Sequence, residues 1–186
     1  MFITGRRQAE LDAAVKKIGG NVTAVRGDVA KLAYLDRLYD TVKKMTERID
    51  ILFANAGIAE FSPLGEITEE HFDQIFNIDV KGLLFSVQKA LALIPDGGSI
   101  ILNASVVASK GNLGFSVYSA AKAAVRSFAR TWILDLKDRK IRVNALSPGP
   151  IDTAIWPSLG RTAGEPRRVE QSSRRKRPVG ALWNAR

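Results

Sequence analysis

Residues 105–122 read SVVASKGNLGFSVYSAAK, and this stretch decides how the rest of the chain is interpreted. The run before it, SIILN at 99–103, is short and apolar, as is typical of a buried parallel strand. Residues 120–136, which follow, are rich in good helix formers. Tyr118 and Lys122 are four apart, so a helix would place them one turn apart on the same face.

These residue types suit proton transfer. An ammonium beside a phenol favours the phenolate and brings the tyrosine pKa, ordinarily about 10, closer to working pH. Such a phenol is a suitable proton donor for carbonyl chemistry. Ser105, at the end of the preceding strand, could place a hydroxyl beside it. Taken alone, a tyrosine four residues before a lysine is more often a surface tyrosine beside a solvated lysine, so the surrounding motifs decide.

The surrounding motifs follow a fixed order along residues 1–156. Asp28-Val29 comes first, then ANAG at 54–57, then the serine, tyrosine and lysine. A second apolar strand at 141–146 and PGPIDT at 148–153 close the series. This conjunction resembles the short-chain dehydrogenase/reductase family, and it is far more specific than any one of its motifs.

The fold class follows from the alternation of elements. Apolar runs at 2–5, 22–25 and 49–53 predict three more strands, with helical periodicity from Leu11 to Ile18 and from Leu32 to Met45. A long helix is expected over 68–93, with Thr68 as its N-cap and strain near Gly82. Strands alternating with helices predict an α/β fold, a Rossmann-like parallel sheet flanked by helices.

The first βα unit of that fold is expected to be missing. In the family it carries a T-G-x-x-x-G-x-G turn before a helix whose N-terminus receives the pyrophosphate. Thr4-Gly5 begins like this turn, but Ala9 and Leu11 occupy the next two glycine positions. Residues 2–7 therefore correspond to the family's second strand. Without the central first strand, we expect a gap between strands 2–5 and 49–53, unless strand 2–5 shifts into it.

The resemblance also implies roles for single residues. Tyr118 would be the general acid/base, Lys122 would lower the pKa of the phenol and bind the nicotinamide ribose, and Ser105 would orient the substrate oxygen. Asp28 would accept a hydrogen bond from the adenine, and Thr153 would hold the nicotinamide carboxamide. The full set implied for cofactor binding is Arg6, Arg7, Asp28, Val29, Asn55, Ala56, Gly57, Tyr118, Lys122, Pro148, Gly149, Ile151 and Thr153.

A departure from the family occurs at its fourth catalytic residue, an Asn in an Asn-(Val/Leu)-x-Gly context. Here NIDVKG at 77–82 places Asp79 at that position. A further negative charge near the site would oppose phenolate formation and could raise the tyrosine pKa. Asn77, two residues earlier, is expected to be a structural helix residue.

The residues after the strand at 2–5 indicate a preference between NAD(H) and NADP(H). An acid at the end of the second strand selects NAD through the ribose 2′-hydroxyl, whereas arginine meets the 2′-phosphate of NADP. Gly5 occupies the position of that acid, and Arg6-Arg7 follow it. The sequence therefore favours NADP(H) over NAD(H).

Composition narrows the classes of protein. Of the 186 residues, 46% are apolar and 25% charged, as in a soluble globular domain. The absence of cysteine excludes disulfides and thiolate metal sites, and the single histidine, His71, is expected on a helix surface. No metal site is expected. No apolar run suits a membrane span and no signal peptide is visible, so a cytoplasmic location is predicted.

The basic character is concentrated near the C-terminus. Residues 157–186 contain eight Lys or Arg against two Glu, which accounts for most of the net charge of +9. They show no apolar periodicity, so two regions are expected: an incomplete oxidoreductase domain at 1–156 and a disordered basic tail at 157–186. An altered reading frame, which we favour, or a tail for nucleic acid or a membrane surface would look the same.

Three hypotheses follow. The first is an NAD(P)-dependent oxidoreductase acting on a small carbonyl or alcohol, and the second is a catalytically inactive remnant of that family. The third, a nucleic-acid binder, would require the basic cluster at 174–177 to dominate. By resemblance, helices 68–93 and 118–136 could form a homodimer or homotetramer interface, with Phe128 and Trp132 as interface or core candidates.

Overall fold

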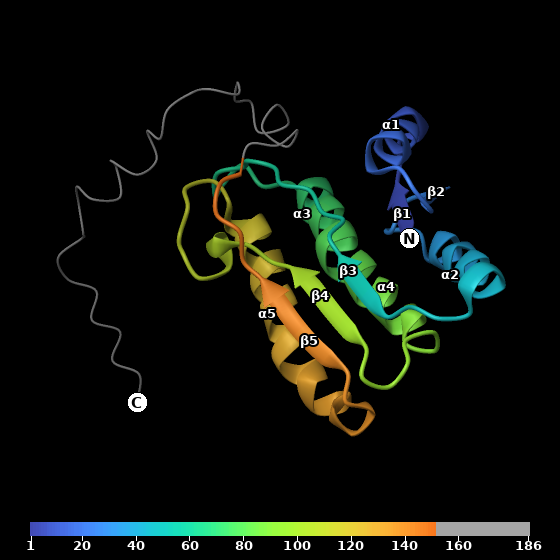
Figure 1. Cartoon of the computed structure of the whole chain (residues 1–186). Coiled ribbons are helices and arrows are strands. Elements are labelled where there is room, and N and C mark those ends of the chain that lie inside the picture. The colour runs from blue at the N-terminus through green and yellow to red at the C-terminus, as the bar shows by residue number, and fades with distance from the viewer. Residues whose placement is uncertain (152–186) are drawn as a thin grey trace. The chain divides into compact units, whose positions relative to one another are not determined.

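Five short strands and the helices between them make up residues 1–151, the part of the chain that this computed structural model describes (Figure 1). β1 (Phe2–Gly5) pairs in parallel with β2 (Thr23–Arg26). β3 (Ile51–Ala54), β4 (Ser99–Asn103) and β5 (Arg142–Leu146) form a second parallel sheet in that order. Both sheets have the parallel pairing that the sequence predicts.

The helices alternate with the strands as expected. The α-helices are α1 (Gln8–Ile18), α2 (Leu32–Thr46), α3 (Glu69–Phe76), α4 (Leu83–Ala90) and α5 (Ser116–Asp135). A π-helical segment, η1 (Asn77–Gly82), joins α3 to α4. Two short 3-10 turns, η2 (Val106–Ala108) and η3 (Lys137–Arg139), flank α5.

Sequence signals set the helix ends. The Thr68 hydroxyl accepts a hydrogen bond from the His71 amide at 3.1 Å, so the predicted N-cap of α3 is confirmed. Gly19 ends α1 with φ of 67°, a conformation that favours glycine. The side chain of His71 is only 13% exposed and lies against Glu60, so the expectation of a surface histidine is wrong.

The long helix expected over 68–93 is instead three consecutive segments. Residues 77–82 widen into a π-helix, and the regular helix resumes at Leu83. A Cβ added at Gly82 would lie 3.0 Å from the Val29 side chain and 3.1 Å from the Val29 carbonyl oxygen. The strain expected near Gly82 therefore takes the form of a π-helical turn where the loop after β2 approaches closely.

One apolar core joins the two sheets through their helices. Leu35 and Leu38 of α2 share a buried cluster with Val87 of α4 and with Ile100 and Leu102 of β4. Across this contact the Tyr39 hydroxyl donates a 2.6 Å hydrogen bond to the Ser86 carbonyl, and Lys89 pairs with Asp36 at the surface. Helix packing therefore holds the β1–β2 pair to the rest of the described region.

The strands do not form one continuous sheet. The order β2-β1 and β3-β4-β5 corresponds to the doubly wound order 3-2-1-4-5-6 with the central strand unfilled in residues 1–151. β1 has not shifted to pair with β3, and the β3 side chains of Ile51 and Phe53 are 65% and 50% exposed. The expected gap between the two strands is confirmed as a break in the hydrogen-bonded sheet.

The contact between α2 and α4 yields a stability prediction. Tyr39→Phe keeps the ring but removes the donor, leaving the Ser86 carbonyl without its partner at a largely buried site. We expect the free energy of unfolding in urea to fall by about 1–3 kcal/mol. Thr131→Ala, which removes an exposed helix-surface hydroxyl, should change it by less than about 0.5 kcal/mol. Equal losses in the two variants would contradict the prediction.

Candidate active site

The candidate residues lie where strands of the sheet end. Ser105 follows β4 and caps η2, with its hydroxyl accepting from the Val107 amide at 3.4 Å. Tyr118 and Lys122 lie one turn apart in the first half of α5, as the spacing predicts. In open α/β sheets, ligands bind beyond the carboxyl ends of the strands, so this edge is the expected place for chemistry.

The structure brings the three side chains together. The Ser105 hydroxyl lies close enough to the Tyr118 phenol to lower its pKa. The Lys122 ammonium lies 5.6 Å from the centre of the Tyr118 ring. Edge-to-face contact with Phe115, at 6.2 Å between centroids, flanks the same ring. A hydroxyl, a phenol and an ammonium therefore lie close together.

Lys122 is held by two acceptors. Its ammonium donates to the Asn103 carbonyl at 3.0 Å and lies 3.1 Å from the Asp79 carboxylate. Asp79 is 0% exposed and Lys122 only 3%, so this ion pair is buried. The other carboxylate oxygen of Asp79 accepts from the Ile58 amide at 2.8 Å. The residue at the family's Asn position is thus in contact with Lys122, whereas Asn77 is exposed.

The electrostatics of the phenol differ from the simplest expectation. Burial raises the pKa of Tyr118 above 10.0, the Asp79 carboxylate raises it further, and the Ser105 hydrogen bond lowers it. The expected depression by Lys122 is therefore wrong for this structure, and the opposing effect expected of Asp79 is found. Burial also raises the pKa of Asp79, against the lowering effects of Lys122 and the Ile58 amide.

Gly57 and Asn103 support the buried pair. A Cβ on Gly57 would lie 3.0 Å from the Asp79 carboxylate and 3.2 Å from the Lys122 ammonium, so only glycine leaves room. Asn103 donates from its side chain to Asn55 at 2.7 Å, besides accepting from Lys122 through its carbonyl. Sequence reasoning assigned Asn103 no role, although its place as the last residue of the strand before Ser105 was a signal.

The predicted adenine-side residues follow three other strands, β1, β2 and β3. Arg6 and Arg7 are exposed directly after β1, where Arg7 approaches Glu10 at 3.8 Å. Asp28 follows β2 and accepts from the Ala30 amide at 3.0 Å, and Val29 packs against Gly82. Asn55, Ala56 and Gly57 directly follow β3 and are exposed at the residue level.

The predicted nicotinamide-side residues follow β5. The Pro148 carbonyl accepts from the Val106 amide at 3.1 Å, which ties this segment to the loop of Ser105. Gly149 and Ile151 are exposed. Thr153 lies outside the described residues. So do the other residues at 152–156 that were assigned to the oxidoreductase domain, and the whole predicted basic tail at 157–186.

The turn between β1 and α1 is not a phosphate cradle. Leu11 is 5% exposed, and its side chain lies 3.4 Å from where a Cβ on Gly5 would stand. The leucine therefore fills the space that a glycine-rich turn leaves for a pyrophosphate. This agrees with assigning residues 2–7 to a later strand than the first.

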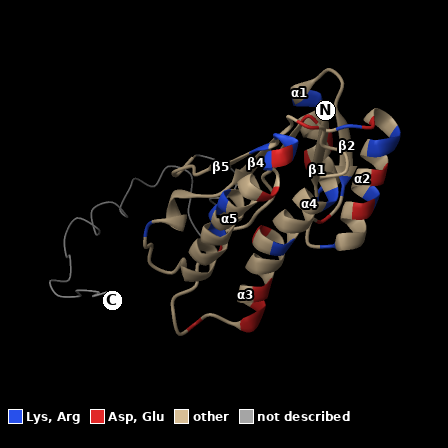
Figure 2. Cartoon of the chain, turned by 90° about the horizontal axis from the view of Figure 1, so that it is seen from below, with Lys and Arg blue, Asp and Glu red and all other residues tan. Residues whose placement is uncertain are grey.

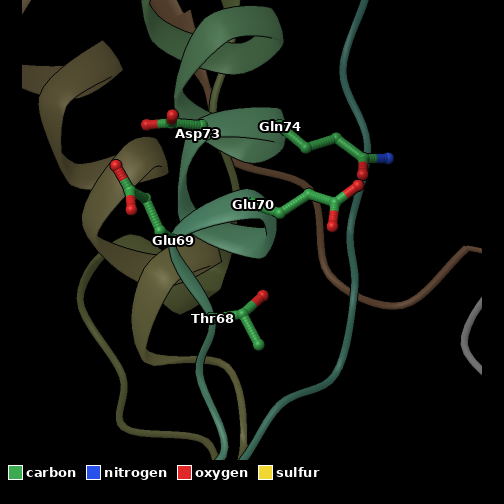
Figure 3. Close-up of a pocket in the computed structure, with 5 residues that line it drawn as sticks. All are labelled: Thr68, Glu69, Glu70, Asp73 and Gln74. Atoms are coloured by element: carbon green, nitrogen blue, oxygen red, sulfur yellow. The ribbon is translucent and has the colours of Figure 1, made fainter.

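A surface hollow beside α3 is separate from these residues. It is lined by Thr68, Glu69, Glu70, Asp73 and Gln74. Figure 3 shows Glu70 and Gln74 pointing to one side of the helix and Glu69 and Asp73 to the other. None of the predicted site residues lines it, and its acidic lining is a poor match for a phosphate-bearing cofactor.

Charge is spread over the described region. In Figure 2, Lys and Arg lie on several helices rather than on one face, and acidic residues mark the start of α3. Within residues 1–151 no group of three or more His, Asp or Glu could hold a metal ion. No helix among those described is both long and apolar enough to cross a bilayer.

Comparison with known proteins decides the family. The family model for short chain dehydrogenases matches residues 1–164. The chain belongs to the short-chain dehydrogenase/reductase family. The oxidoreductase asL5 of Sarocladium schorii is 48% identical over 157 residues, covering 83% of this chain and 63% of that protein. The tetrahydroxynaphthalene reductase of Pyricularia oryzae is 32% identical over 153 residues, covering 82% and 54%.

Solved structures of the family share the fold. A dehydrogenase/reductase from Sinorhizobium meliloti superposes with a TM-score of 0.78 at 30% identity, covering 83% of this chain and 63% of that one. A short-chain dehydrogenase/reductase from Serratia marcescens gives 0.79 at 28%, covering 83% and 65%. The predicted Rossmann-like α/β fold is confirmed. The chain spans 63% of the length of the oxidoreductase asL5 and 54% of the length of the tetrahydroxynaphthalene reductase.

The close approach at Gly57 yields a second prediction. In Gly57→Ala the new methyl group meets two charged groups that are buried and fixed, so neither can move aside. We expect a loss of about 1–3 kcal/mol in the free energy of unfolding. Gly111→Ala is the matched control, because nothing lies within 4 Å of its added Cβ. The prediction is wrong if both variants unfold at the same urea concentration.

Proposed function

We propose that the chain is an NADP(H)-dependent oxidoreductase that transfers hydride between the nicotinamide and a carbonyl or alcohol, with Tyr118 as general acid/base. The observation that carries this proposal is the convergence of the Ser105 hydroxyl, the Tyr118 phenol and the Lys122 ammonium at a carboxyl-end edge of the sheet. Family membership supports it, since the short-chain dehydrogenase/reductase family implies oxidoreductase chemistry and a nicotinamide cofactor.

The chain's own groups account for the proton. In carbonyl reduction the Tyr118 hydroxyl donates its proton to the substrate oxygen, and the Ser105 hydroxyl donates a hydrogen bond to the same oxygen. In alcohol oxidation the phenolate takes that proton back. The nicotinamide, when bound, supplies or accepts the hydride.

Several features fit a nicotinamide nucleotide. An ammonium has three donors; Lys122 donates to the Asn103 carbonyl at 3.0 Å and lies 3.1 Å from the Asp79 carboxylate. The resemblance implies that a further donor of this ammonium binds a ribose hydroxyl. Exposed Asn55 and Ala56 beside the buried pair leave backbone for a ligand to approach.

NADP(H) is favoured over NAD(H) by the end of β1. Exposed Arg6 and Arg7 stand where an acid would bind a ribose 2′-hydroxyl, and guanidinium groups suit a 2′-phosphate instead. Both residues are exposed, and the contact of Arg7 with Glu10 lies at the surface, so both guanidinium groups are accessible to a ligand. The arginine pair is the only support for this choice of cofactor.

The names of relatives suggest a substrate class to test first. A tetrahydroxynaphthalene reductase is 32% identical to this chain, and a hydroxynaphthalene reductase-like protein of Metarhizium brunneum is 34% identical over 143 residues. Polyhydroxylated aromatic ketones are therefore the first carbonyl substrates to offer. The reduction direction also agrees with a phenol that keeps its proton.

A second candidate, a remnant that does not catalyse, has its own supporting observations. β1 and β3 are unpaired with each other, and Leu11 occupies the space above the β1–α1 turn. A pyrophosphate would then lack the helix N-terminus that normally binds it. Cofactor titration separates this candidate from the enzyme.

Assembly through α3–α4 and α5 remains a prediction. Phe128 and Trp132 stack at 4.9 Å between centroids and pack against the chain's own core, which favours a core role for them. Ile133 and Leu134 of the same helix are 47% and 68% exposed. These two are the better candidates for contact with a second copy.

The third prediction tests catalysis in the purified full chain. NADPH should bind with micromolar affinity by fluorescence titration, and Tyr118→Phe should lower kcat for carbonyl reduction about 10²–10⁴-fold with little change in NADPH affinity. Ser127→Ala, an exposed position on α5, serves as the control and should keep its activity. Absence of binding at millimolar NADPH would favour the remnant instead.

The fourth prediction tests cofactor choice. Replacing Arg6 and Arg7 together by serine should weaken NADPH binding about tenfold or more, because a 2′-phosphate loses its cationic partners, while NADH binding changes little. Arg26→Ser, at the exposed end of β2, controls for a general loss of positive charge. Equal affinity of the parent chain for NADH and NADPH would argue against the assignment.

A further inference from the structure

The buried ion pair of Asp79 and Lys122 determines the charge that lies next to Tyr118. Asp79 is enclosed completely, with one oxygen on the Ile58 amide at 2.8 Å and the other 3.1 Å from the Lys122 ammonium. The ammonium in turn donates to the Asn103 carbonyl at 3.0 Å. Two further segments of the chain, the loop after β3 and the end of β4, therefore hold the two charges of η1 and α5.

The π-helical turn places the carboxylate there. In η1 the backbone is wider than in an α-helix, and Ile78, Asp79 and Gly82 are its buried residues. Gly82 is pressed against Val29, and Gly57 leaves no space for a side chain over the pair. Asp79 is consequently enclosed next to Lys122.

This geometry bears on the direction of the reaction. We propose that Asp79 is a positioning residue that holds the Lys122 ammonium and cancels its charge, so that Tyr118 keeps its proton at neutral pH and the site works as a carbonyl reductase. Oxidation of alcohols, which requires the phenolate, would be confined to alkaline pH. This inference rests on the proposed function of the same site.

The charged groups facing the phenol are few. From η1 comes the Asp79 carboxylate and from α5 itself the Lys122 ammonium, whereas β4 and its following loop supply the neutral Asn103 carbonyl and Ser105 hydroxyl. Asp79 and burial both raise the pKa of Tyr118, and Ser105 lowers it. Raising the pKa of a phenol stabilises its protonated form, which is the form that donates to a carbonyl.

Two neighbouring groups favour the ionised form of the Asp79 carboxyl group. Burial raises the pKa of its carboxyl group, but the ammonium and the Ile58 amide both favour the carboxylate. The Lys122 ammonium 3.1 Å from one carboxylate oxygen and the Ile58 amide 2.8 Å from the other stabilise the carboxylate, whose negative charge opposes loss of the proton from Tyr118.

The test is a direct titration of Tyr118 in the full chain. Phenolate formation is followed by ultraviolet absorbance and by carbon NMR of labelled tyrosine, with Tyr118→Phe assigning the signal. We expect the parent midpoint to lie above the ordinary tyrosine value. In Asp79→Asn it should fall by about one pH unit or more, a tenfold change in the ionisation constant.

Two controls separate electrostatics from structure. Asp79→Asn keeps an oxygen for the Ile58 amide and nearly the same shape, so loss of the charge is the main change. Asp36→Asn removes another aspartate that is paired with a lysine, Lys89, but at the surface, and it should not move the Tyr118 midpoint. If Asp79→Asn fails to fold, the smaller neutral Asp79→Ser replaces it.

The outcome is independent of whether the chain turns over substrate. A parent midpoint at or below the ordinary tyrosine value would overturn the inference without any variant, and so would an unshifted midpoint in folded Asp79→Asn. Where the chain is active, the alkaline rise of alcohol oxidation should move to lower pH in Asp79→Asn and stay in place in Asp36→Asn. An inactive chain that still shows the Tyr118 shift would refute the proposed function but leave the charge cancellation intact.

Discussion

The ion pair between Asp79 and Lys122 is the constraint on which the site depends. Removing two charges from water costs several kcal/mol for each ion, and only close partners offset this. The Ile58 amide and the Asn103 carbonyl supply those partners. Removing one ion would leave the other buried without compensation, at a cost of about 3–5 kcal/mol. The loop after β3, the π-helical turn, the end of β4 and α5 are thereby locked to one another.

The ion pair lies in only one of the two sheets of the fold, the one formed by β3, β4 and β5. Ser105, Tyr118, Lys122 and Asp79 all belong to elements of the β3-β4-β5 half, as do Asn55, Ala56 and Gly57 of the expected adenine side. Arg6, Arg7, Asp28 and Val29 instead follow β1 and β2. The halves are joined by packing of α2 on α4 rather than by hydrogen bonds between β1 and β3. Ser105, Tyr118, Lys122 and Asp79 therefore come together without a continuous sheet, because the partners of the Asp79–Lys122 pair lie in one half, although Val29 of the other half packs against Gly82.

Much of this arrangement could be predicted from local sequence patterns. β4 has the predicted bounds because an apolar run ends there in polar residues, and the four-residue spacing of Tyr118 and Lys122 requires only that a helix forms. The π-helical turn was not predicted as such, since hydrophobic periodicity does not distinguish one widened turn inside a long helix from strain at Gly82. Asn103 was missed because its contribution is made partly by a backbone carbonyl, which no residue type reveals.

The pKa of Tyr118 was harder to predict than which residues lie together in the site. Spacing places an ammonium next to a phenol, and by itself this lowers the phenol pKa. Whether the ammonium acts as an uncompensated charge depends on a third group from a different element, and on how deeply all three are buried. Asp79 has a carboxylate oxygen where the asparagine of the family pattern has an NH2 group. This difference adds a negative charge beside Lys122. The sequence names Asp79 at that position and indicates that its charge opposes phenolate formation, but its buried contact with Lys122 follows only from the distances and the burial.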